Sequence, residues 1–232
     1  MGVSMRKIFI LGATKYSFMI HELICQEKQY EIVGHSVNEK YLEECRPLCD
    51  EAGVELFPLE NLSQYADENG VVYVLNTLGY TNMNRTRQKI QAECLSLGYQ
   101  SVNYISDRAI VLSKLKGTGN IVFPGAYIGT NISIGDCNVI YAGCVLTHDI
   151  QIESFNFVAA NVTIGGEVHI GNNCFLGMGA TLKNRINVSD FSLIGASAYL
   201  AHSTKKCEVV VPEKSVTLSK SSFEISLTPK PE

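Results

Sequence analysis

The adjacent residues His148 and Asp149 are the side chains of this sequence best suited to proton transfer. A neutral imidazole can remove a proton from an amine or a hydroxyl that attacks a thioester, and a neighbouring carboxylate can fix its tautomer and favour the imidazolium that forms. A lone histidine can also be a surface residue without a role. The elements that position His148 therefore decide between the two interpretations.

An unbroken six-residue repeat surrounds His148. Every sixth residue is Val, Ile or Leu over fourteen consecutive steps, namely Val122, Ile128, Ile134, Ile140, Leu146, Ile152, Val158, Ile164, Ile170, Leu176, Leu182, Val188, Ile194 and Leu200. So long a run at one phase is very unlikely by chance, and a short fixed period is the sequence mark of a solenoid. The period predicts a parallel β-helix.

Two further positions of the repeat indicate a left-handed β-helix. The residue after the aliphatic position is often glycine, which we interpret as the residue that turns a corner. These glycines are Gly129, Gly135, Gly165, Gly171, Gly177 and Gly195. The residue four places after the aliphatic position is usually small or aliphatic, as at Cys144, Val162 and Ala180. Three six-residue steps then make one triangular coil, and residues eighteen apart stack at about 4.8 Å.

The repeat places His148 at an outward-facing corner, two residues after Leu146. Gly166, Asn184 and His202 follow at eighteen-residue intervals and stack above it in that order. Because Gly166 has no side chain, the groove one coil above His148 is open to a long, thin ligand. In a trimer of such prisms the corner residues line the groove between neighbours. This combination favours a functional His148.

We expect no metal site, because a catalytic zinc ion needs three converging imidazoles. His148 and His202 lie three coils, roughly 14 Å, apart, and His169 is out of phase with both. His21 lies in a predicted helix and His35 in a predicted strand, where a histidine is more often packed or exposed without a role.

The eight cysteines match neither a CxxC pair nor a zinc-binding spacing. Cys144 and Cys174 occupy inward positions of the repeat, whereas Cys25 and Cys94 lie in predicted helices. We expect reduced structural thiols in a reducing compartment.

The composition excludes several classes of partner. The 232 residues carry a net charge of −4 with scattered Lys and Arg, so there is no footprint for nucleic acid and no polybasic membrane anchor. The start has no signal-peptide core, and no apolar stretch approaches the roughly eighteen residues of a spanning helix. We expect a cytoplasmic protein that binds small molecules, with no membrane insertion.

The first 105 or so residues lack the six-residue period and alternate between strand and helix patterns. The expected strands are 7–12, 31–37, 54–58, 71–76 and 101–105, and the expected helices are 14–28, 39–52 and 85–97. This alternation predicts a small, parallel, Rossmann-like sheet. Ligands of such sheets bind beyond the carboxyl ends of the strands, which points to 12–16, 37–39 and 76–81.

The loop after the first strand lacks G-x-G-x-x-G, so a dinucleotide fingerprint is absent. Gly12, Thr14 and Lys15 can hold a phosphate of a mononucleotide at the helix N-terminus, or they can form a plain strand-to-helix turn. Asn38 and Glu39 can contact a base or a ribose; alternatively, Asn38 caps the next helix.

The two-part layout, the unbroken repeat and Thr147-His148-Asp149 resemble the bacterial sugar acyltransferases of the NeuD family, which include PglD-type N-acetyltransferases and sialic acid O-acetyltransferases. The resemblance is strongest over 164–177 (IGGEVHIGNNCFLG) and 193–198 (LIGASA). It implies a sugar-nucleotide-binding domain over 1–106 and a left-handed β-helix acyltransferase domain with an irregular C-terminal tail over 107–232. It further implies a homotrimer with acetyl-CoA along the cleft between adjacent β-helices.

The resemblance also implies roles for individual residues. His148 matches the family's general base and Asp149 its acidic neighbour. The positions that match backbone contacts to the CoA arm are Gly166, Gly177, Met178 and Ala196. Gly12 matches the phosphate-side glycine, and Asn38 stands at an acidic position that contacts the base.

The sequence departs from the family at several of these places. Phe157 replaces a second histidine, nine residues after the base, that helps to hold the thioester carbonyl; we therefore include it among the substrate-binding residues and expect an altered acyl site. Thr14, Lys15 and Tyr16 replace a Gly-His element, and Glu153 replaces a glycine.

From these observations we expect an acetyl-CoA-dependent acyltransferase that N-acetylates a nucleotide-linked amino sugar for surface glycan synthesis, such as lipopolysaccharide or O-antigen. His148 is its expected base, and no metal is needed. One alternative is an O-acetyltransferase that acts on a free sugar such as sialic acid. Another is a catalytically silent trimeric scaffold, for which Phe157 is the main argument.

Overall fold

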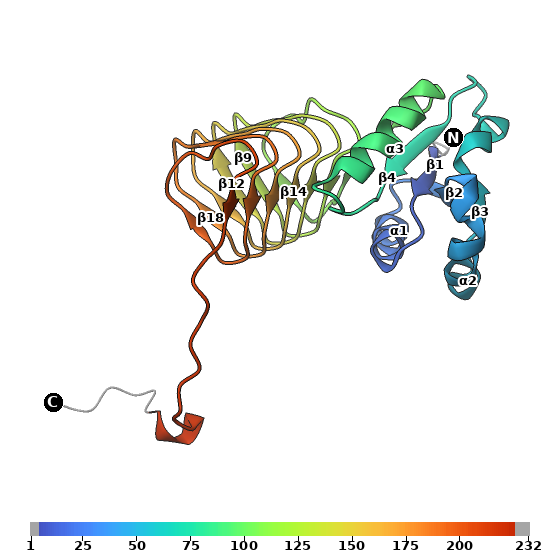
Figure 1. Cartoon of the computed structure of the whole chain (residues 1–232). Helices are drawn as coiled ribbons and strands as arrows, with labels where there is room; N and C mark the ends of the chain where they lie inside the picture. The colour runs from blue at the N-terminus through green and yellow to red at the C-terminus, as the bar shows by residue number, and fades with distance from the viewer. Residues whose placement is uncertain (1–4, 226–232) are drawn as a thin grey trace.

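The computed structural model describes residues 5–225, in which a parallel sheet flanked by helices adjoins a β-helix (Figure 1). The first sheet has five parallel strands in the order β3-β2-β1-β4-β5. Their bounds are β1 Lys7–Leu11, β2 Glu31–Val37, β3 Leu56–Pro58, β4 Tyr73–Asn76 and β5 Gln100–Ser101. The expected parallel sheet is confirmed, and its strand order changes direction at β1 and β4, where ligands of such sheets bind.

Helices cover both faces of this sheet. They are α1 Lys15–Glu27, α2 Leu42–Ala52 and α3 Arg85–Ser96, with 3₁₀ turns η1 Glu39–Tyr41 and η2 Leu59–Tyr65. Ile20 of α1 packs with Ile8 of β1, whereas Ile90 of α3 packs in the cluster of Phe9, because successive strand residues face opposite sides. The single helix expected over 39–52 is split into a 3₁₀ turn and an α-helix.

The rest of the chain is a β-helix with three parallel sheets. Their orders are β22-β20-β17-β14-β11-β8-β6, β21-β18-β15-β12-β9-β7 and β10-β13-β16-β19. The strands are β6 Tyr104–Ile105, β7 Ile110–Val111, β8 Ile121–Val122, β9 Tyr127–Thr130, β10 Ser133–Ile134, β11 Val139–Ile140, β12 Val145–His148, β13 Gln151–Ile152, β14 Phe157–Val158, β15 Thr163–Ile164, β16 His169–Ile170, β17 Phe175–Leu176, β18 Thr181–Leu182, β19 Asn187–Val188, β20 Leu193–Ile194, β21 Tyr199–Leu200 and β22 Val209–Val210. Paired residues such as Leu146 and Ile164 are eighteen apart, which confirms the predicted coil.

The aliphatic positions of the repeat form the core of the β-helix, and Ile164 among them is fully buried. The glycines after them do not turn the corners as we expected. Left-handed backbone falls two places later, at residues such as Asn131 (φ 56°) and Asp149 (φ 55°), types that tolerate it. The glycines instead allow neighbouring coils to approach, since a Cβ on Gly177 would lie 2.5 Å from the backbone nitrogen of Ala196.

The change from one sheet system to the other falls between β5 and β6. β5 pairs with β4, whereas β6 pairs with β8 of the β-helix, just before the boundary expected at residue 106. After β22 the chain leaves the β-helix as an extended segment that ends in a short 3₁₀ turn, η3 Ser222–Glu224 (Figure 1). Over residues 5–225, none of the helices has the length and apolar character needed to span a bilayer.

Buried polar contacts attach α3 to the β-helix. The guanidinium of Arg87 is fully buried and donates to the backbone oxygen of Asn156 (3.0 Å) and to Oδ1 of Asn84 (3.2 Å). Asn84 donates in turn to the backbone oxygen of Cys174 (3.0 Å). Because a buried guanidinium is costly to leave unpaired, these bonds hold α3 in one place, and its opposite face is free to line a ligand site.

Candidate active site

His148 ends strand β12 and pairs with Asp149. Its Nδ1 lies 2.8 Å from Oδ2 of Asp149, and about half of each side chain is exposed. Because a carboxylate only accepts hydrogen bonds, Nδ1 carries the proton and the lone pair of Nε2 is free. Asn131 donates to the other carboxylate oxygen, and the hydrogen bonds from Asn131 and His148 lower the pKa of Asp149. The arrangement presents Nε2 as a base oriented by a carboxylate.

Asn131 is a residue that the sequence analysis missed. It stands eighteen residues before Asp149, one coil away along the same corner, and its Nδ2 donates to Oδ1 of Asp149. The stacking rule that links His148 to Gly166 also links these two residues, so the signal was present in the sequence.

Gly166 lies next to the imidazole, but for a different reason than expected. A Cβ on Gly166 would lie 2.5 Å from Nε2 of His148. The ring itself therefore occupies the space that we expected to be open to a ligand. The backbone of Glu167 stabilises the end of β12, because its N–H donates to the backbone oxygen of His148 (3.1 Å). The contact of Gly166 with CoA stays a prediction.

Gly177, Met178 and Ala196 lie at another corner. They follow β17 and β20, where the chain passes from the seven-stranded sheet to the six-stranded sheet. His148 instead lies where the chain passes from the six-stranded sheet to the four-stranded sheet. Met178 is 63% exposed, and Ala196 stacks next to it one coil further on. One chain therefore carries the two groups at opposite edges of its six-stranded sheet and does not bring them together.

Phe157 does not lie with His148 either. It is only 5% exposed and packs in the cluster shared by the first sheet, α1 and the β-helix. Its ring centre lies 5.1 Å from that of Tyr80 and 5.8 Å from that of Phe175. The structure gives Phe157 a packing role between the two parts of the chain.

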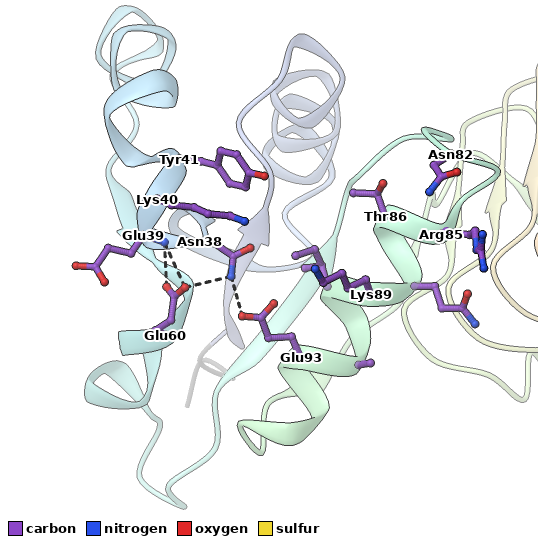
Figure 2. Close-up of a pocket in the computed structure, with 13 residues that line it drawn as sticks. Asn38, Glu39, Lys40, Tyr41, Glu60, Asn82, Arg85, Thr86, Lys89 and Glu93 are labelled. Carbon is purple, nitrogen blue, oxygen red and sulfur yellow. Dashed lines mark hydrogen bonds between the residues drawn. The ribbon is translucent and has the colours of Figure 1, made fainter.

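A cleft of about 1300 Å³ opens between the residues that follow β2 and helix α3 (Figure 2). One wall is formed by residues 38–41, and the other by α3 and the loop before it. A smaller, largely apolar pocket of about 240 Å³ shares Asn38 with this cleft and reaches Gly12 and Thr14. The structure thus brings three of the predicted substrate-binding residues together, whereas Lys15 is exposed and lines neither space.

The cleft also contains cations that the sequence analysis did not single out. Lys40 comes from η1, and Arg85 and Lys89 come from the first turns of α3. Within residues 5–225 none of the three forms an ion pair with a carboxylate. Lys40 lies over the ring of Tyr41 (4.8 Å) and Arg85 over the ring of Phe191 (5.7 Å), contacts that leave their charges available to an anionic ligand such as a diphosphate.

Gly12 is held by two backbone-directed hydrogen bonds. The backbone N–H of Gly12 donates to the backbone oxygen of Ser36 (2.9 Å), and Nδ1 of His35 donates to the backbone oxygen of Gly12 (2.7 Å). Its φ of +114° favours glycine, and a Cβ would lie 2.9 Å from Oγ of Ser17. The hydroxyl of Thr14 accepts from the backbone N–H of Ser17 (3.2 Å) and so caps α1. The turn presents a fixed N-terminus of α1 to the smaller pocket.

The alternative that Asn38 caps the following helix is wrong. Its side chain makes no capping hydrogen bond; instead the carboxylate of Glu60 accepts from the backbone N–H of Glu39 (3.1 Å). The amide nitrogen of Asn38 donates to Oε1 of Glu60 (3.1 Å) and to Oε1 of Glu93 (2.7 Å). The Asn38 side chain is therefore part of the cleft.

The cysteines are free thiols. Burial raises the pKa of Cys144 to about 11 and that of Cys174 to about 12, so both stay protonated near neutral pH. This supports the expectation of structural thiols. Among residues 5–225, no three His, Cys, Asp or Glu side chains are grouped to hold a metal ion.

Comparison with known proteins identifies the repeat. Residues 149–184 match the family model described as bacterial transferase hexapeptide (six repeats). This segment of the β-helix therefore carries hexapeptide repeats of the type that the family model describes. The sequence matches no curated protein.

Three solved structures share the fold of nearly the whole chain. A mutant of perosamine N-acetyltransferase from Caulobacter crescentus, in complex with CoA and GDP-perosamine, is 20% identical with a TM-score of 0.77, and the match covers 91% of this chain and 96% of that chain. The acetyltransferase domain of PglB from Neisseria gonorrhoeae is 21% identical with a TM-score of 0.73, covering 89% and 97%. The same domain in complex with acetyl coenzyme A is 20% identical with a TM-score of 0.74, covering 90% and 97%.

Proposed function

We propose that the protein is an acetyl-CoA-dependent acyltransferase that N-acetylates a nucleotide-linked amino sugar in the cytoplasm, for surface glycan synthesis. The observation that carries this proposal is the His148–Asp149 pair, which leaves Nε2 as a base at an exposed corner. Structures with the same fold hold CoA with GDP-perosamine, or acetyl coenzyme A. Their ligands support an activated acyl donor and a sugar-nucleotide acceptor for this chain.

His148 acts on the amine of the acceptor. The amine nitrogen attacks the carbonyl carbon of the thioester, and Nε2 takes the amine proton as the N–C bond forms. The C–S bond then breaks, and the CoA thiolate takes the proton from the imidazolium. Asp149 stabilises that imidazolium through Nδ1. A positioned base contributes about 10² to 10⁴-fold, and orientation of the two substrates supplies much of the rest.

A homotrimer completes the acyl site. The six-stranded sheet has apolar side chains on its outer face, among them Ile110 (57% exposed) and Tyr199 (64% exposed). A head-to-tail contact that closes after three copies buries part of this face and brings the His148 corner of one chain to the Met178 and Ala196 corner of the next. Acetyl-CoA then lies along the groove between the two β-helices.

The N-terminal domain holds the acceptor. Gly12 and Thr14 place the N-terminus of α1 beside the smaller pocket, and the unpaired cations of the larger cleft suit the phosphates. A diphosphate carries more negative charge than the single carboxylate of free sialic acid, so three cations favour a nucleotide-linked sugar. Phe157 packs between the two parts of the chain and does not fill the space beside His148, so the catalytic proposal rests on His148 and Asp149 without a second histidine.

The test compares two histidines of the same corner. His148→Asn should lower the rate of acetyl transfer from acetyl-CoA to nucleotide-linked 4-amino sugars by about 10² to 10⁴-fold, with CoA affinity unchanged. His202→Asn is the matched control, because His202 is exposed three coils further along, and it should keep full activity. Full activity of His148→Asn would overturn the proposed function.

A further inference from the structure

The amide of Asn38 has only one orientation that its surroundings allow. Its nitrogen donates to Oε1 of Glu93 (2.7 Å) and to Oε1 of Glu60 (3.1 Å), so both amide hydrogens point at carboxylates (Figure 2). A flipped amide would place Oδ1 against the same two anions. Oδ1 is therefore turned away from the Oε1 atoms of Glu60 and Glu93 and presents a hydrogen-bond acceptor to the cleft.

Glu93 adds a second acceptor beside it. Its Oε1 is occupied by Asn38, whereas its Oε2 accepts no hydrogen bond from any residue in the 5–225 range. Glu60 does not add another, because both of its carboxylate oxygens also accept from the backbone N–H of Glu39. Asn38 and Glu93, from opposite walls of the cleft, therefore offer two neighbouring acceptors.

Two neighbouring acceptors match a ligand edge with two neighbouring donors. Guanine has such an edge, formed by N1–H and the 2-amino group. Uracil and thymine have one N–H between two carbonyl oxygens, and those oxygens would face the acceptors of Asn38 and Glu93. Cytosine and adenine have an amino group beside a ring nitrogen that is itself an acceptor. A site of unpaired acceptors discriminates strongly against such edges.

The surroundings of Asn38 suit the rest of a guanine nucleotide. The smaller pocket that adjoins Asn38 is lined by Leu11, Val37, Leu59 and Ile90, which can cover the faces of a purine. Free cations of the larger cleft are available to a diphosphate. Building on the proposed function, we propose that the acceptor is linked to guanine, whose N1–H and 2-amino group are bound by Oδ1 of Asn38 and Oε2 of Glu93.

Calorimetric titration of the full chain with GDP, IDP and UDP tests this assignment. GDP should bind at least about tenfold more tightly than UDP, since each mismatched polar contact at a charged group weakens binding about tenfold. IDP, which lacks the 2-amino group, should bind about tenfold more weakly than GDP. These comparisons need no substitution and so do not depend on the folding of a variant.

Two variants locate the recognition. Glu93→Gln can turn an amide N–H₂ to the ligand in place of Oε2, so it should weaken GDP about tenfold without weakening UDP. Glu43→Gln is the matched control, because it removes the same charge from an exposed residue of α2 that lines neither space, and it should leave both affinities unchanged. Equal or tighter binding of UDP to the wild-type chain would overturn the guanine assignment and leave the sugar-nucleotide function intact. Failure of all three nucleotides to bind would instead overturn the proposed acceptor site.

Discussion

The β-helix and the N-terminal domain place their candidate chemistry by different rules. In the β-helix, residues one coil away contact the His148–Asp149 pair. Gly166 lies against the imidazole of His148, and Asn131 donates to Asp149, each at a separation of eighteen residues. In the N-terminal domain the cleft joins Asn38, which follows β2, to Glu93, which lies on α3. No fixed spacing links those two residues.

The difference follows from the range of the contacts. Each coil of a solenoid touches only its neighbours, so one period specifies the whole stack. A doubly wound sheet brings loops together at a switch point, but the loops and helix ends that reach it depend on packing across the domain. A repeat therefore locates single residues, whereas an α/β pattern locates only a region.

The stability of the β-helix provides the largest expected effect. Ile164→Ala should lower the free energy of unfolding by about 2–5 kcal/mol, because it leaves a cavity in a fully buried stack. Thr163→Ala, which changes the neighbouring outward-facing residue, should cost less than about 1 kcal/mol. Chemical denaturation measures both. Similar losses for the two variants would contradict the alternation of inward-facing and outward-facing residues in the repeat.

The N-terminal domain should show a pH dependence that a single buried histidine explains in part. Burial, and then the neighbouring His21, lower the pKa of His35 to about 4. From the ordinary value near 6.5 down to 4, the unfolded chain binds a proton that the folded chain does not, so stability falls as the pH falls across this window, by roughly 3 kcal/mol at most.

His35→Asn should flatten this slope. The amide nitrogen of Asn can replace Nδ1 as the donor to the carbonyl of Gly12, so the variant keeps that contact without the titration. Denaturation at several pH values between 4 and 7 compares the two proteins. Parallel stability curves would show that His35 does not contribute.

Gly166→Ala should reduce turnover by about 10 to 100-fold. The added Cβ would enter the space of the imidazole and displace Nε2 of His148, and small displacements of a catalytic group are costly. Glu167→Ala, at the next residue, removes only an exposed ion pair with Arg185 and should change turnover less than twofold. Steady-state kinetics should show the loss in kcat. An unchanged kcat for Gly166→Ala would contradict the position assigned to the ring.

Asn131→Ala should have the smallest effect, a decrease in kcat of about two- to tenfold. Asn131 orients the carboxylate of Asp149 and does not touch the imidazole, so it acts as a positioning residue. Asn184→Ala changes an exposed residue of the His148 corner and is the matched control. If both variants lose activity equally, the contact between Asn131 and Asp149 is not the cause. The pH dependence of turnover, which a purely structural role would not move, should also change only in Asn131→Ala.

Much of the β-helix could be predicted residue by residue because its period is regular. The buried aliphatic positions, the eighteen-residue pairing and the exposed position of His148 where the chain passes from one sheet to the next are confirmed. The role of the glycines was wrong, because sequence shows that a small residue is needed but not whether backbone angle or close approach requires it. The burial of Phe157 was missed, because it depends on the neighbouring domain.

In the N-terminal domain the strands and the segments beyond their carboxyl ends were predictable from alternation, and these segments contain Gly12 and Asn38. Arg85 and Lys89 were not, because a helical pattern does not show which face meets β2 across the cleft. The fully buried Arg87, on the same helix, shows how strongly the two faces differ.

Mixed trimers test most directly the claim that one base serves an acyl site completed by the next chain. His148→Asn removes the base, and Ala196→Trp fills the opposite corner, so either variant alone should be inactive. Equal mixing, with mixed trimers verified by native mass spectrometry, should restore about a quarter of the wild-type sites, because a chain that keeps His148 then meets a chain that keeps Ala196. Mixed trimers no more active than the separate variants would place the whole site within one chain and contradict a site shared between chains.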